Sequence, residues 1–172
     1  MPDFTDLSIL PRTLGLTVGA AEQRERRDLL VMRVGGARLL GVFADEAGSV
    51  TEWREPTPLP RAAGAVLGVV SIRGLMLTVL DPLQLLGEPS ANGSPRPAFI
   101  VALRGDEQLA LAVDRAEGIE EIFPDEIEPL TRSAGSSILS GLLQHGRELI
   151  AVLDTGELFA AAMQGEERRR RR

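Results

Sequence analysis

Short apolar segments separated by turn-forming residues recur along most of the chain, and their length is typical of β-strands. Several segments are apolar at every position, so we expect both faces of these strands to be covered in the folded protein. Two β-hairpins are predicted, each with a glycine-containing turn: Leu29–Val34 with Arg38–Phe43 around Gly35-Gly36, and Val66–Ile72 with Leu75–Leu80 around Arg73-Gly74.

Pro56–Pro60 contains three prolines, which exclude a helix and favour an extended crossing segment. Two short helices are predicted at Pro82–Leu86 and Thr155–Met163. The remaining predicted strands are Val50–Arg54, Phe99–Leu103, Leu109–Val113, Ile119–Phe123, Ile138–Leu143 and Leu149–Leu153.

The second half of the chain repeats the first. Residues 68–81 return as residues 141–154 without a gap, with Gly68 matching Gly141 and Asp81 matching Asp154. The segments within 99–113 echo the opening hairpin at a constant offset of 70 positions. One β unit used twice predicts an all-β fold of two small barrels packed side by side.

The repeat and the linker composition divide the chain. Residues 88–97 contain Pro, Ser, Asn and Gly in close succession and are predicted to link barrel one (29–87) to barrel two (98–163). Residues 1–28 are predicted to form a flexible leader. Residues 164–172 form a charged tail that ends in Arg168–Arg172. We expect this tail to be solvated, and attraction to an anionic lipid surface is the alternative.

Composition narrows the possible functions. Hydrophobic residues make up 44% of the 172 positions, enough for a packed interior. Aromatic residues make up only 3% and the net charge is −6, which argues against nucleic acid as a partner. A signal peptide and an apolar run of about 20 residues are both missing from the sequence, so we expect a cytoplasmic protein without membrane insertion.

The sequence contains no Cys, no Lys and a single His. Disulfides, thiolate zinc sites, cysteine nucleophiles, P-loop lysines and multi-histidine metal centres are therefore excluded. The one histidine, His145, is expected to be an exposed turn residue. We expect no catalytic residue, no cofactor and no metal.

Asp81 and Asp154 follow equivalent strands and admit two interpretations. As paired carboxylates they would suit a small β-barrel hydrolase. As helix N-caps they would bind backbone N–H groups, because Asp81 precedes Pro82 and Asp154 has Glu157 in the third helical position. The second interpretation, two structural caps, is favoured.

Arg73 is the only charged residue between Val66 and Leu80, and it lies in a short turn. A planar guanidinium suits an interface because it binds carboxylates with two hydrogen bonds. A solvated turn residue or an internal salt bridge is the alternative.

The stretch from Pro60 to Gly87 resembles the signature of the CheW-like domain: a glycine, two apolar residues, Asn-Leu-Arg-Gly, then an apolar strand ending in Asp. The second half agrees in Leu111–Asp114, Asp125–Leu130 and Leu149–Asp154. The similarity extends from about Leu29 to Met163.

This resemblance implies a cytoplasmic, non-catalytic adaptor built from two five-stranded SH3-like barrels. The adaptor would couple the cytoplasmic tip of methyl-accepting chemoreceptors to the regulatory domain of a CheA-type histidine kinase, at membrane receptor arrays. The partner-binding residues would be Ser71, Ile72, Arg73 and Gly74.

Four positions depart from the family pattern. Ser71 and Ile72 replace the usual Asn-Leu, and Thr78 replaces a frequent proline. Ser49 stands where the family commonly has a glutamate that pairs with the arginine, so Glu46 or Glu52 is the alternative partner for Arg73. These departures leave open a pilus-motility or other chemosensory pathway.

Overall fold

The computed structural model describes residues 25–88, 93, 95–105, 108–130, 137–158 and 160–161. The predicted leader up to residue 24, the charged tail and part of the predicted linker lie outside these residues.

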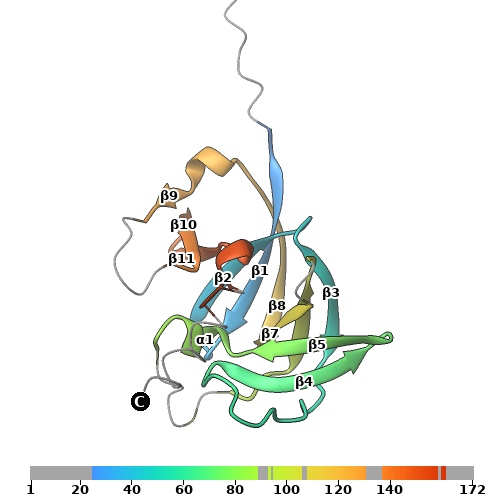
Figure 1. Cartoon of the computed structure of the whole chain (residues 1–172). Helices are drawn as coiled ribbons and strands as arrows, with labels where there is room; N and C mark the ends of the chain where they lie inside the picture. Colours follow the sequence, from blue (N-terminus) through green and yellow to red (C-terminus); the bar gives the residue numbers. More distant parts are fainter. Residues whose placement is uncertain are drawn as a thin grey trace, which may run out of the picture.

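The described chain is mostly β-structure, arranged in two sheets (Figure 1). The six-stranded sheet has the order β8-β1-β2-β11-β10-β9, and the five-stranded sheet has the order β3-β6-β7-β5-β4. The all-β class is thus confirmed, although one sheet has six strands. The strands are β1 (Arg27–Val34), β2 (Arg38–Phe43), β3 (Ala47–Glu52), β4 (Val66–Ile72), β5 (Leu75–Leu80), β6 (Phe99–Leu103), β7 (Leu109–Val113), β8 (Arg115–Ile122), β9 (Glu128–Pro129), β10 (Leu139–His145) and β11 (Glu148–Leu153).

Strands from residues 29–87 and strands from residues 98–163 occur together in each of the two sheets. The β1–β2 hairpin joins β8–β11, whereas the β6–β7 hairpin joins β3–β5. Each repeat unit therefore gives its opening hairpin to the sheet of the other unit. Two pairs of parallel strands connect these hairpins to the sheets: β2 pairs with β11, and β5 pairs with β7.

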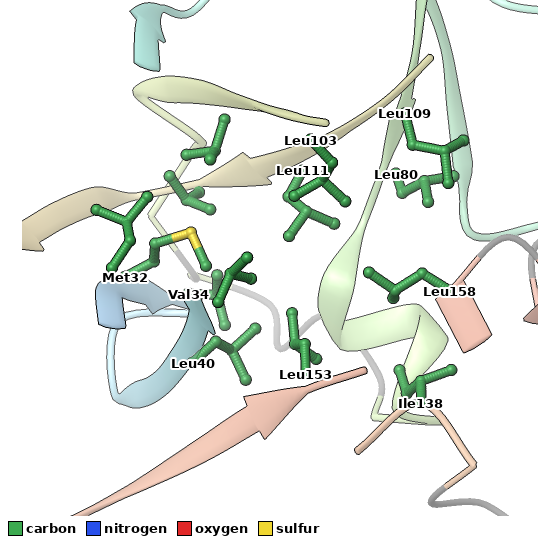
Figure 2. Close-up of a cluster of buried hydrophobic side chains, with 14 of the residues drawn as sticks. Met32, Val34, Leu40, Leu80, Leu103, Leu109, Leu111, Ile138, Leu153 and Leu158 are labelled. Carbon is green, nitrogen blue, oxygen red and sulfur yellow. The ribbon is translucent and has the colours of Figure 1, made fainter. Parts of the chain in front are cut away.

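Three buried clusters fill the fold. The first, which we call the interface core, lies between the two sheets and includes Met32, Leu80, Leu111 and Leu153 (Figure 2). The second lies on the face of the six-stranded sheet opposite to the interface core and includes Leu29 and Val31. The third consists of residues of the five-stranded sheet, including Val79 and Ile100. Successive residues of β1 alternate between two clusters, which explains why this strand is apolar at consecutive positions.

Two short helices follow the repeated hairpins. The helix α1 (Pro82–Leu85) begins after Asp81, and residues 155–158 and 160–161 are helical after Asp154. Leu158 is fully buried in the interface core beside Leu80 and Ile138 (Figure 2). A short 3₁₀ helix, η1 (Pro124–Glu126), precedes β9.

Candidate interaction surface

The β4–β5 hairpin ends in a two-residue turn formed by Arg73 and Gly74. Its register pairs Ile72 with Leu75 across the turn. Both turn residues have positive φ angles, 51° for Arg73 and 82° for Gly74, as a type I′ turn requires. Asn-Gly is the sequence that this turn favours, whereas arginine is strained there. A strained residue in an exposed turn suggests a function for its side chain.

Apolar side chains flank this turn at the surface. Leu75 is 55% exposed and Met76 is 56% exposed, and both directly follow Gly74. Ser71, Arg73 and Gly74 are also exposed, whereas Ile72 is buried in the core of the five-stranded sheet. The hairpin tip therefore presents a cation beside two apolar side chains, which is the composition of a protein-binding surface.

Arg73 makes no ion pair or side-chain hydrogen bond with another residue of the described ranges. Glu46, one alternative partner, instead forms a side-chain hydrogen bond with Thr155, and burial raises the pKa of the Glu46 carboxyl group. Glu52 and Arg73, which both lie within the described ranges, likewise form no ion pair with each other. Within this part of the protein Arg73 is available to an outside carboxylate.

The equivalent turn of the second repeat, Gly146-Arg147, differs in its backbone. Gly146 has a φ of 60° and comes first, so the glycine and arginine exchange places relative to Arg73-Gly74. Gln144 Nε2 donates to the carbonyl oxygens of Gly146 and Glu148, at 2.9 and 3.2 Å. Glu148 stands where the first repeat has Leu75, so this turn lacks an apolar residue at that position.

Leu75 and Met76 were not identified as site residues from the sequence. They were interpreted as strand residues covered on both faces, because apolar residues dominate the segment. Comparing the two repeats could have revealed Leu75, which matches Glu148, because a polar residue at one of two equivalent positions indicates exposure. Met76 matches the apolar Leu149, so the comparison gives no such signal for Met76.

Asp81 and Asp154 each accept hydrogen bonds from a helix N-terminus. Asp81 Oδ1 lies 3.0 Å from the backbone nitrogen of Leu83 and 3.5 Å from that of Gln84. Asp154 Oδ1 lies 3.2 Å from the backbone nitrogen of Glu157. These are N-cap contacts, which satisfy donors that the helix itself leaves without partners.

His145 is the last residue of β10 and is about half exposed. Its Nε2 lies 3.9 Å from Oε1 of Glu120 on β8, so this contact spans two strands that are not neighbours in the sheet. The described ranges contain no cluster of three or more acidic, histidine or cysteine side chains suited to a metal ion.

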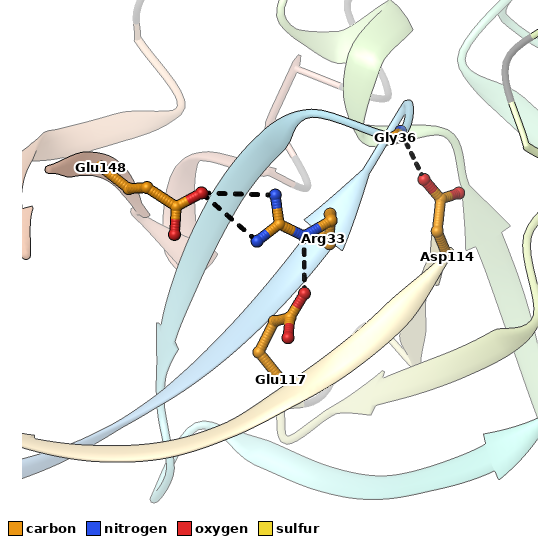
Figure 3. Close-up of polar contacts among 5 residues, drawn as sticks. All are labelled: Arg33, Gly36, Asp114, Glu117 and Glu148. Atoms are coloured by element: carbon orange, nitrogen blue, oxygen red, sulfur yellow. Dashed lines mark hydrogen bonds and ion pairs between the residues drawn. The ribbon is translucent and has the colours of Figure 1, made fainter.

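A polar joint connects the β1–β2 turn to the five-stranded sheet. The backbone N–H of Gly36 donates to Asp114 Oδ2 at 2.7 Å (Figure 3). A Cβ atom on Gly35 would approach Leu83 Cδ1 of α1 to 2.6 Å, so the Leu83 side chain would have to move, and the φ of 59° also favours glycine there. On the neighbouring face, Arg33 Nε donates to Glu117 Oε1 at 2.6 Å, and Arg33 also contacts Glu148 (Figure 3).

Beside this joint lies an open groove of about 480 Å³. The residues that line it come from the β1–β2 turn, the segment after β3, β4, α1, the segment before β6 and the end of β7. They are Val34, Gly35, Trp53, Glu55, Leu67, Asp81, Leu83, Pro95, Arg96, Pro97, Ala112 and Asp114.

The described residues include no helix with the length and apolarity that a membrane span needs.

Comparison with known proteins identifies one family. The family model of the CheW-like domain matches residues 16–163. Protein FrzA of Myxococcus xanthus is 32% identical over 149 residues, which cover 84% of this chain and 92% of that protein. Chemotaxis protein CheW of Rhizobium meliloti is 28% identical over 137 residues, covering 77% of this chain and 87% of that protein.

A solved structure has the same fold. The scaffolding protein TtCheW from Thermoanaerobacter tengcongensis superposes with a TM-score of 0.66 over 76% of this chain and 90% of that one. Its sequence identity is 18%, so this likeness concerns the fold alone.

Proposed function

This chain belongs to the CheW-like domain family, and we propose that it joins a CheA-type histidine kinase to chemoreceptors through the tip of the β4–β5 hairpin. As a member of this family the chain is a non-catalytic chemotaxis adaptor. The alternative of a hydrolase using Asp81 or Asp154 is therefore wrong, and both carboxylates contact helix N-termini.

The proposed partners are the regulatory domain of the kinase and the cytoplasmic tip of a methyl-accepting chemoreceptor. The protein would act in the cytoplasm, at receptor arrays on the membrane. The single observation that carries the site is the hairpin tip: Arg73 is held in a strained turn, has no acidic partner among the described residues, and precedes the exposed Leu75 and Met76.

Binding at this tip combines two kinds of contact. Leu75 and Met76 are more than half exposed, so a partner can remove their apolar surface from water. The guanidinium of Arg73 can form two hydrogen bonds with one carboxylate, which fixes the orientation of the partner. Ser71 pairs with Met76 on the neighbouring strand and adds a polar group at the edge.

Calorimetric titration against the purified kinase regulatory domain tests this proposal. Arg73→Ala should weaken the complex at least tenfold, or about 1.4 kcal/mol, because the partner carboxylate loses its cation. Arg147→Ala is the matched control, since Arg147 is an exposed arginine in the equivalent turn of the other repeat, and its affinity should not change.

Arg73→Asn separates binding from folding. This change creates the Asn-Gly pair that type I′ turns favour, so the melting temperature should stay the same or rise. Affinity should fall as it does for Arg73→Ala. Wild-type affinity in both Arg73 variants would move the kinase site elsewhere on the protein.

A further inference from the structure

The groove beside α1 is lined by more acidic than basic side chains. Besides the N-cap residue Asp81, the carboxylates of Glu55 and Asp114 line it, against the guanidinium of Arg96. Burial, and to a smaller extent the charge of Asp81, raises the pKa of the Asp114 carboxyl group. Positive charge on an occupant would therefore strengthen its binding in this groove.

The groove also offers apolar and aromatic surface. Trp53 packs partly against the core of the five-stranded sheet and partly lines the groove, and its Nε1 lies 3.4 Å from Glu55 Oε2. Leu67 and Leu83 contribute apolar surface beside it. An arginine side chain suits this combination, because its guanidinium can bind carboxylates and stack on an indole, while its methylene groups cover apolar atoms.

The last helical residues of the described chain share the interface core with α1. Leu158 and Ala161 belong to the same apolar cluster as Leu83 and Leu85 of α1, and Leu83 also lines the groove. Residues 162–167 separate this anchored helix from the arginine tail, Arg168–Arg172. A segment of that length reaches at most about 20 Å when fully extended.

We propose that the arginine tail docks in the groove beside α1, with its guanidinium groups on Glu55 and Asp114 and over Trp53. The groove lies at the end of the five-stranded sheet near α1, whereas Arg73 lies at the opposite end of the β4–β5 hairpin (Figure 1). The contact is therefore separate from the proposed kinase site and stands independently of it.

Tethering makes a weak contact sufficient. A short flexible linker gives the tail an effective concentration on the order of millimolar at the groove. A free peptide of the same sequence therefore needs a dissociation constant only in that range for the tethered tail to occupy the groove for much of the time. Charge pairs at a surface are screened over about 10 Å in 0.1 M salt, so the contact should be lost as salt rises.

Trp53 provides a direct readout, because it is the only tryptophan in the chain and it lines the groove. The test compares the full chain with a variant in which all five residues Arg168–Arg172 are replaced by Gln. The Trp53 emission of the wild type should change between 20 mM and 500 mM salt and should not depend on protein concentration. The variant should show no such change.

Titration in trans then tests the groove. Penta-arginine peptide added to the Gln variant at low salt should restore the wild-type emission. Adding Glu55→Gln and Asp114→Asn to that variant should weaken peptide binding at least tenfold. Glu120→Gln with Glu121→Gln is the matched control, because it removes the same charge from β8, outside the groove, and should reduce binding less than threefold.

Three results would overturn the proposal. The first is the same salt response in the wild type and the Gln variant. The second is equal loss of peptide binding in the groove variant and the β8 control, which would indicate attraction to net charge only. The third is a wild-type signal that grows with protein concentration, which would assign the occupant of the groove to a second copy of the chain.

Discussion

Gly68 and Gly141, at matching positions of the two repeats, are both crossed by another segment of backbone. A Cβ atom on Gly68 would lie 2.3 Å from the carbonyl oxygen of Thr57, and one on Gly141 would lie 2.5 Å from that of Glu128. Thr57 forms a β-bridge with Val69, and β9 pairs with β10 at Gly141. Each glycine thus permits an extended segment to pair with the outer strand of its hairpin.

Replacing either glycine should destabilise the fold. Gly141→Ala should cost about 1–3 kcal/mol, because backbone atoms must move to admit the methyl group. Gly68→Ala should cost more, since its φ of 146° is also unfavourable for alanine. Gly74→Ala is the control: it has a φ of 82° but no atom within 4 Å of the new Cβ, so only the backbone penalty of roughly 1–2 kcal/mol applies. Urea denaturation measures all three.

The helix caps make a second prediction. Asp154→Ala should lower the free energy of unfolding by about 1 kcal/mol, because the N–H of Glu157 loses its acceptor. Asp154→Asn should retain most of the stability, since asparagine is an equally good N-cap residue. Equal losses in the two variants would mean that the charge of Asp154, and not the cap, stabilises the protein.

Asp114 should make stability depend on pH. Burial raises the pKa of its carboxyl group above the unfolded value, with a smaller contribution from the charge of Asp81. The folded protein therefore holds this proton to higher pH than the unfolded chain does. Consequently, the contribution of Asp114 to stability falls as pH rises from about 4 through the raised pKa.

Asp114→Asn removes this dependence and keeps an oxygen acceptor for the Gly36 N–H. The variant should be more stable than the wild type at pH 7, and the two should converge below about pH 4. Thermal unfolding between pH 3 and 8 measures the difference. A variant that is less stable at pH 7 would show that the carboxylate charge stabilises the joint.

Two ion pairs on β8 should differ in strength. Arg33 and Glu117 are 26% and 29% exposed and 2.6 Å apart, whereas Arg26 and Glu121 are 57% and 56% exposed. Glu117→Gln should cost about 1 kcal/mol, because Arg33 is left partly buried with only the longer contact to Glu148. Glu121→Gln, the matched control, should change stability by less than about 0.5 kcal/mol.

The prediction for this pair fails if both variants lose the same free energy of unfolding, since solvent exposure would then not set the strength of the pair. Repeating the urea denaturation at high salt adds a second check. Exposed pairs are screened more strongly than buried ones, so the effect of Glu117→Gln should persist in salt.

Local sequence was sufficient for the elements that bury apolar residues. The two hairpins at Gly35-Gly36 and Arg73-Gly74 were predicted, because strand length, apolar pattern and turn residues agree there. Local sequence was insufficient for β8, which is predicted at Ile119–Phe123 and observed at Arg115–Ile122. It was also insufficient for the pairing of β9. Both are largely exposed edge strands, whose polar residues carry no alternating apolar pattern.

The proposed interaction surface also follows only in part from the sequence. Arg73 stood out because it is the one charge in an apolar segment, but exposure of Leu75 and Met76 depends on where the hairpin extends beyond the sheet. The sequence likewise does not show that Arg73 lacks an internal partner within the described ranges. This depends on the tertiary structure, in which Glu46 forms a side-chain hydrogen bond with Thr155 of the second helix instead.

The sequence alone determined that one β unit is used twice and that most of its apolar strand residues are buried. Only the tertiary structure decided that each unit gives its opening hairpin to the other sheet. The physical reason lies in the repeat itself. The β1–β2 and β6–β7 hairpins have the same apolar pattern, so local preference fits either sheet. The choice between them is made by the parallel pairs β2–β11 and β5–β7, which join residues far apart in the chain.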